Sequence, residues 1–157
     1  PIVEFYQVER ASSKQDAGWL ILNAGNGSTT YVQGLKEALE EARGVYIFYD
    51  SQGRALYVGK AQKSSLWKEM NLAYNRRRNV QKISVVHHPT KNQKFEPGHE
   101  KLRQPKLTRF ELFDMACYFS AYAVDSGMIG DIEALMVRGF SNNLLNVRME
   151  TFEKSRG

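Results

Sequence analysis

The pattern of apolar and polar positions predicts a short antiparallel hairpin in the first half of the chain. Residues 45–49 and 55–58 are rich in the β-branched and aromatic side chains that favour strands. Between them, residues 50–54 contain the Asp and Gly that are typical of turns. We therefore expect a β-hairpin with a loop of about five residues, in which alternate side chains lie on opposite faces.

Apolar residues recur at helical spacing in three other segments, and Ser or Thr residues that can act as N-caps precede the first two. The three predicted helices are residues 30–43, 66–77 and 128–140, and the last is expected to bury Ile129, Ile132, Met136 and Phe140. Further apolar runs predict strands at residues 2–8, 19–22, 80–87 and 116–124. Residues 88–107 hold three of the four prolines, so we expect a long surface loop there.

The composition is that of a globular chain. A length of 157 residues, with 42% hydrophobic and 25% charged residues, is typical of one domain. No apolar run approaches the roughly 20 residues that span a bilayer, and no signal peptide is evident, so we expect no membrane partner. The single cysteine, Cys117, excludes an internal disulfide and any zinc site built from several cysteines. These features favour a cytoplasmic protein.

Positive charge is concentrated in one part of the sequence. The net charge is +5, but residues 60–109 alone contain thirteen basic and three acidic residues. A surface of this charge density attracts a polyanion through Coulomb forces and counterion release. The alternative interpretation is a solvated, lysine-rich face without a partner.

Two tripeptides flank the turn of the predicted hairpin. Gly44-Val45-Tyr46 and Tyr57-Val58-Gly59 lie ten residues apart, and Lys60 follows the second. This pair resembles the signature of the GIY-YIG nuclease superfamily. The resemblance covers residues 44–148 and implies an α/β (α+β) fold, with a small three-stranded mixed sheet flanked by helices. Residues 1–43 are then an N-terminal β/α extension that packs on the core or docks a protein partner, and residues 149–157 are a polar tail.

The same resemblance implies a DNA endonuclease that uses Mg²⁺ or Mn²⁺. The family places a glutamate on a late helix and an asparagine beyond its end, which correspond to Glu133 and Asn146. Glu133 lies between Ile129 and Val137 on its side of the predicted helix. A carboxylate there is costly to bury without a partner, so we expect a metal ion or a cationic side chain beside it.

The sequence departs from the family at the arginine of the helix after the hairpin. Glu69 occupies the position that the family pattern gives to this arginine. Arg76 follows seven residues later, in nearly the same direction on a helix. We therefore expect Arg76, held by Glu69, to supply the guanidinium, with Arg77 as the alternative.

The remaining expected roles follow from the chemistry of phosphodiester cleavage, which needs a base, charge relief and close approach of the backbone. Tyr46 is the expected base, assisted by Lys60 or metal-bound solvent, and Tyr57 orients water or a phosphate oxygen. Aromatic packing is the alternative for both tyrosines. The expected substrate contacts are Gly59, Asn146, Arg77, Arg78, Lys82 and His87. Two other functions stay open, namely a catalytically inactive nucleic-acid-binding module and a protein-interaction domain that uses residues 1–43.

Overall fold

The chain forms two compact units. The computed structural model describes residues 1–9, 18–76, 78–87, 92–97 and 101–140. One unit, which we call the core, comprises Pro1–Arg76 and Glu111–Gly157, and the other, which we call the ribbon, is Arg77–Phe110. The ribbon is therefore inserted in the chain between two segments of the core.

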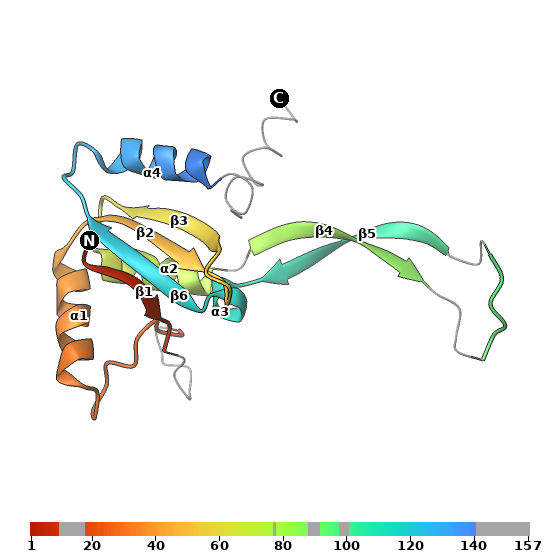
Figure 1. The fold of residues 1–157 in the computed structure, drawn as a ribbon, viewed down its shortest axis with the longest axis horizontal. Helices are drawn as coiled ribbons and strands as arrows, with labels where there is room; N and C mark the ends of the chain where they lie inside the picture. Colours follow the sequence, from red (N-terminus) through yellow and green to blue (C-terminus); the bar gives the residue numbers. More distant parts are fainter. Residues whose placement is uncertain (10–17, 77, 88–91, 98–100, 141–157) are drawn as a thin grey trace. The chain divides into compact units, whose positions relative to one another are not determined.

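An antiparallel sheet of four strands, in the order β1-β6-β2-β3, forms the centre of the core (Figure 1). The strands are β1 (Val3–Gln7), β2 (Gly44–Tyr49), β3 (Ala55–Ala61) and β6 (Tyr118–Ala123). The predicted hairpin is confirmed as β2 and β3. The expected three-stranded mixed sheet is wrong in detail, because β1 pairs with β6 and makes the N-terminal segment part of the sheet.

Helices α1 (Thr30–Glu41), α2 (Leu66–Asn75) and α4 (Ile129–Gly139) flank this sheet, and the short α3 (Leu112–Met115) precedes β6. The hydroxyl groups of Thr29 and Ser65 each accept a hydrogen bond of 3.3 Å from the third residue beyond, which begins α1 and α2. The three predicted helices are confirmed. No helix in the described part of the chain is long and apolar enough to cross a membrane.

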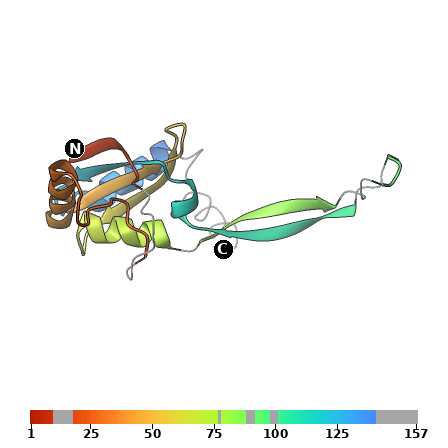
Figure 2. The ribbon, with the colours of Figure 1, turned by 90° about the horizontal axis from the view of Figure 1, so that it is seen from below.

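The two longer helices beside the hairpin, α2 and α4, cover opposite faces of the sheet (Figures 1 and 2). On one face, Ile47 and Val58 pack with Met136 of α4. On the other face, the ring of Phe48 stacks on that of Tyr74 in α2, with 6.0 Å between centroids. Successive residues of β2 and β3 therefore serve different helices.

Residues 19–22 are bound to α2 and do not form the strand that the sequence predicted. The amide oxygen of Asn75 accepts a hydrogen bond of 2.8 Å from the backbone of Trp19, and that of Asn71 accepts one of 3.0 Å from Ile21. Asn75 also donates to the Trp19 carbonyl at 2.6 Å. The two asparagine side chains thus take the place of a partner strand.

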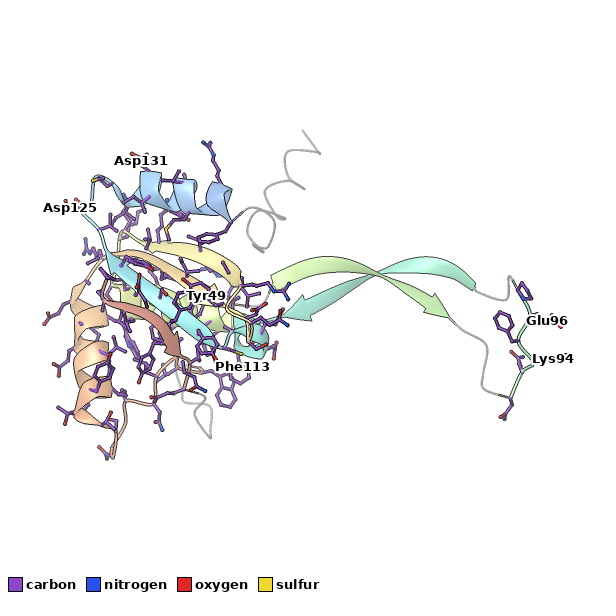
Figure 3. The ribbon with its side chains drawn as sticks, in the orientation of Figure 1. Tyr49, Lys94, Glu96, Phe113, Asp125 and Asp131 are labelled. Atoms are coloured by element: carbon purple, nitrogen blue, oxygen red, sulfur yellow. The ribbon has the colours of Figure 1, made fainter. Side chains whose placement is uncertain are left out.

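Trp19 also contacts the segment that follows the ribbon in the chain. Its ring stacks on that of Phe113 in α3, with 4.5 Å between centroids, and Phe113 is labelled in Figure 3. Asn75 is the last residue of α2, just before the ribbon begins. Trp19 therefore holds together the two core segments from which the ribbon leaves and to which it returns.

The ribbon consists of β4 (Arg78–His87) and β5 (Lys101–Phe110), which pair with each other in a separate antiparallel sheet. The strand predicted at residues 80–87 exists, but it does not join the core sheet. The loop predicted over residues 88–107 is wrong from Lys101 onward, where β5 begins. Another prediction fails at Phe140, which is 40% exposed because it lies beyond the end of α4.

Candidate functional site

The glycines of the two tripeptides are required by packing. A Cβ atom on Gly59 would collide with the ring of Tyr46, the residue directly opposite it on β2. A Cβ atom on Gly44 would collide with the backbone carbonyl of Tyr122 on β6. Both glycines therefore allow close contacts that build the sheet, whatever chemistry the hairpin performs.

The tyrosines of the two tripeptides, Tyr46 and Tyr57, lie on the α2 face. Tyr46 is only 2% exposed, and its hydroxyl donates a long hydrogen bond of 3.5 Å to the backbone carbonyl of Glu69. Its ring lies 6.1 Å from that of Tyr57, between centroids. Tyr57 is half-buried and therefore within reach of solvent. The burial of Tyr46 favours the packing role over the expected role as a base, whereas Tyr57 remains accessible.

Lys60 and Glu133 meet on the α4 face. The ammonium of Lys60 on β3 lies 3.2 Å from Oε2 of Glu133 on α4, and the two side chains are 44% and 24% exposed. Glu133 precedes Val137, which packs on the sheet, by one helical turn. The sequence led us to expect a metal ion or a cationic side chain beside this carboxylate, and Lys60 is such a side chain.

The tyrosines and the Lys60–Glu133 pair therefore lie on opposite faces of the sheet, next to the same strand. Tyr57 and Lys60 lie three positions apart on β3, which is an edge strand of the core sheet and pairs only with β2 among the described strands. Residues an odd number of positions apart point to opposite faces. The tyrosines and the Lys60–Glu133 pair form two clusters that border the same edge of the sheet.

The structure corrects the predicted position of Arg76. Helix α2 ends at Asn75, and Arg76 has extended backbone angles, φ −68° and ψ 123°. It therefore does not continue the helical direction of Glu69, and seven helical residues advance by about 10 Å along the axis. No ion pair joins Glu69 and Arg76, both of which are described, and Arg76 is exposed.

Glu69 instead binds a residue that the sequence analysis did not consider. Its Oε1 accepts a hydrogen bond of 2.6 Å from the hydroxyl of Ser64, which directly precedes the N-cap of α2. A hydroxyl just before a cap and an acidic residue in the first turns of the helix are a recognisable local signal. The Glu at the family's arginine position thus has a structural partner near the start of α2.

The expected substrate contacts fall into three groups. Gly59 lies in the hairpin, beneath Tyr46. Arg78, Lys82 and His87 lie on β4 and belong to the ribbon, not to the core sheet. Asn146 and Arg77 lie outside the described residues.

A divalent ion could use Glu133 as one ligand. Mg²⁺ is commonly held by one or two carboxylates, with water and substrate phosphates completing its shell. Oε1 of Glu133 accepts no hydrogen bond from any described residue, so this oxygen suits such a role. The described residues contain no group of three or more His, Cys, Asp or Glu that could hold an ion. The donor set therefore fits a metal that is shared with a bound phosphate.

Comparisons of the chain with protein-family models, with curated proteins and with solved structures gave no match.

Proposed function

We propose that this protein is a metal-dependent DNA endonuclease of GIY-YIG type, which hydrolyses phosphodiester bonds at the β3 edge of the core sheet. The observation that supports it most is the Lys60–Glu133 pair at 3.2 Å, which places a cation and a carboxylate beside the Tyr-Val-Gly strand. Placing a carboxylate on the sheet-facing side of a helix costs desolvation free energy. A function of this carboxylate would explain why it is there despite that cost. Phosphate chemistry supplies such a function for both members of the pair.

Each accessible residue has a distinct task in this proposal. Glu133 holds the divalent ion, Mg²⁺ or Mn²⁺, which when bound would stabilise charge on the scissile phosphate. Lys60 fixes the Glu133 carboxylate in the free protein and turns to a phosphate oxygen when DNA occupies the edge. Tyr57 orients the attacking water from the other face of β3. Tyr46 and Gly59 keep the strand in place.

Arg76 enters the proposal as a phosphate-binding residue rather than a group held by Glu69. It is exposed, and no described residue forms an ion pair with it. Its guanidinium is therefore available for the forked hydrogen bonds that phosphate accepts. We expect its removal to weaken DNA binding more than it slows nicking at saturating protein.

Nicking of supercoiled plasmid in Mg²⁺ tests the proposal. The wild type is expected to nick, and Glu133→Ala is expected to lose at least about 100-fold in rate, because one metal ligand accounts for several kcal/mol of charge stabilisation. Folding should persist in Glu133→Ala, since a half-exposed ion pair contributes only about 0–1 kcal/mol. Circular dichroism and DNA binding in EDTA check that the variant is intact.

Asp131→Ala is the matched control. Asp131 is an exposed acid on the same helix, on the side away from the sheet (Figure 3). Its removal changes the net charge by the same amount, and nicking should stay at the wild-type rate. Wild-type activity in Glu133→Ala, or an equal loss in Asp131→Ala, would contradict the assignment of Glu133.

The second candidate function is DNA binding without cleavage. Helix α2 contains no arginine, and Glu69, in the family's arginine position, is bonded to Ser64. A site without this guanidinium lacks one source of charge relief at the phosphate. Salt-sensitive DNA binding by the wild type, with no nicking in Mg²⁺ or Mn²⁺, would select this alternative.

A further inference from the structure

The ribbon carries a large share of the positive charge of the protein. Residues 77–110 include nine of the 22 Lys and Arg residues and two of the 17 Asp and Glu residues. The paired strands themselves hold six basic and no acidic residues. A two-stranded ribbon is too thin to bury a core of its own. Its composition is therefore suited to a polyanionic partner.

The register distributes this charge over both faces of the ribbon. Lys82 pairs with Leu107, and Ile83 pairs with Lys106, so Lys82 and Lys106 lie at adjacent positions of opposite face. The register shifts near each end of β4, between Asn79 and Gln81 and between Val85 and His87. Such bulges increase the right-handed twist of a ribbon. A twisted ribbon with positive positions on both faces matches a groove that has a phosphate strand on each side.

The size of the ribbon matches duplex DNA. Each strand has ten residues, which corresponds to a length of about 33 Å. One turn of B-DNA is about 34 Å long. A two-stranded ribbon also fits the width of the major groove, which is about 12 Å. The strands are thus long enough to follow a groove for about one turn.

An aromatic side chain stands exposed in the segment that joins the strands. Phe95 is 85% exposed, the highest value among the large apolar residues described as exposed. All of residues 92–97 are exposed, and the neighbours Lys94 and Glu96, labelled in Figure 3, lie in the segment that joins β4 and β5 in the chain. Exposing a Phe ring to water is unfavourable by about 1.5–3 kcal/mol relative to burying it. The ring therefore has a strong tendency to enter an apolar or stacked environment.

We propose that the ribbon is a DNA-binding arm whose basic strands follow the phosphate backbone while Phe95 stacks on a nucleobase. This inference rests on the proposed function, in that DNA is the substrate. An aromatic wedge inserted between base pairs unstacks them and kinks the duplex, and stacking on an unpaired base gives similar energy without a bend. The arm explains both the charge and the exposed ring, whereas a protein partner would need matching acidic residues to account for the charge.

The test uses the full chain in EDTA, so that binding is measured without cleavage. The probes are a duplex of about 30 base pairs, labelled at its ends for energy transfer, and a single strand of the same sequence. Phe95→Ala is expected to weaken binding about tenfold, as loss of one stacked base does. Phe95→Trp should restore it. A change in energy transfer that is lost in Phe95→Ala identifies insertion into the duplex, and an effect on the single strand alone identifies an unpaired base.

Charge is tested separately. Lys101→Gln/Arg103→Gln is expected to reduce the slope of log K against log salt by about 2. Lys36→Gln/Arg138→Gln removes two charges outside the ribbon, and Leu135→Ala removes an apolar side chain that is 71% exposed. Both controls should bind like the wild type. If the ribbon variants also bind like the wild type, or if the controls weaken binding equally, the inference is wrong.

The nicking assay and the binding assay test the proposed nuclease and the proposed arm separately. A wild type that nicks plasmid DNA, with ribbon variants that bind and nick normally, overturns the arm and keeps the nuclease. A wild type that binds through the ribbon but never nicks overturns the nuclease and keeps the arm. A wild type that binds neither probe at low salt overturns the arm and favours a protein partner for the ribbon.

Discussion

At the scale of single residues, a Cβ atom added to either glycine of the tripeptides would collide with a neighbour, and the two neighbours differ in how easily they can move. The Cβ of Gly44 would meet a backbone carbonyl, whereas that of Gly59 would meet the end of a tyrosine side chain. A backbone atom can retreat only if the strand moves. The two glycines are therefore a requirement of the sheet, and the presence of the motif alone does not decide between an active and an inactive protein.

A series of glycine substitutions measures this requirement. Gly59→Ala is expected to lower the free energy of unfolding by about 1–3 kcal/mol through overpacking, and Gly44→Ala by more. Gly34→Ala is the contrasting change, because Gly34 lies inside α1 with nothing within 4 Å of its Cβ position. It should stabilise the protein by about 0.5–1 kcal/mol. Urea unfolding of the three variants would contradict this account if Gly44→Ala were neutral.

We expect Tyr122 to make the free energy of unfolding decrease with pH in the alkaline range. Partial burial and the hydrogen bond of 2.8 Å that it donates to Glu4 raise the pKa of Tyr122 from 10.0 to about 12. Between these values the unfolded chain loses the phenolic proton while the folded chain keeps it. The free energy of unfolding contributed by this group is thus full below pH 10.0 and falls as the pH rises through about 12.

Tyr122→Phe is therefore expected to flatten the decline of stability above pH 10.0. The measurement is the urea midpoint at several alkaline pH values, and Tyr31→Phe, at a tyrosine that is 63% exposed, is the control. Burial also raises the pKa of Tyr49, which stacks on Phe5, so a smaller decline should persist in the variant. An unchanged slope in Tyr122→Phe would rule out this residue as its source.

The candidate site could be predicted from the sequence only as far as local periodicity reaches. The position of Glu133 in an apolar helical stripe follows from 3.6-residue spacing, and its need for a cation follows from the cost of burial. The identity of Lys60 as that cation depends on how α4 packs on β3, which no local pattern encodes. Arg76 was misplaced because its predicted direction assumed that the helix continues to residue 77, whereas α2 ends at Asn75.

At the scale of elements, the side-chain amides of α2 replace a strand. Asn71 and Asn75 are one turn apart and bind the backbone of residues 19–21. Two asparagines at positions i and i+4 of a half-buried helical face can therefore bind the backbone of an extended segment through their side-chain amides. The short apolar run alone predicts a strand there and misses the side-chain partner.

Asn75→Ala should remove three hydrogen bonds at once. We expect the free energy of unfolding to fall by about 1–3 kcal/mol, because the backbone groups of Trp19 lose their partners in a half-buried place. Leu72→Ala, at an exposed position of the same helix, should change it by less than about 0.5 kcal/mol. Equal urea midpoints for Asn75→Ala and the wild type would show that residues 19–22 do not depend on this contact.

The composition of β5 explains why the sequence did not predict a strand. Its ten residues include four basic residues and Pro105, which are more typical of loops. In a two-stranded ribbon neither strand has neighbours on both sides, so a proline can avoid the ladder of hydrogen bonds. Strand formation here depends on pairing with β4, and pairing between distant segments is not visible in local propensity.

At the scale of the whole molecule, the core and the ribbon differ in the size of their sheets, which have four strands and two strands. Every residue of β2 is buried, whereas an isolated two-stranded hairpin is marginally stable in water. Amide hydrogen exchange should therefore be slow in β2 and β6 and much faster in β4 and β5. Addition of duplex DNA should slow exchange in the ribbon and leave the core unchanged. Mass spectrometry of peptic peptides makes this measurement, and a ribbon as protected as β2 in the free protein would contradict it.

Trp19 connects the two core segments between which the ribbon is inserted. Trp19 binds Asn75, which precedes the ribbon in the chain, and stacks on Phe113, which follows it. The two core segments next to the insertion are therefore held together by contacts within the core. The entropy of closing a loop grows slowly with its length, by about 0.6 kcal/mol for each doubling. The inserted segment can therefore change in length or sequence at a small entropic cost while the core sheet stays intact. In the proposed nuclease, the segment that is proposed to hold DNA can then vary separately from the Lys60–Glu133 pair at the sheet edge.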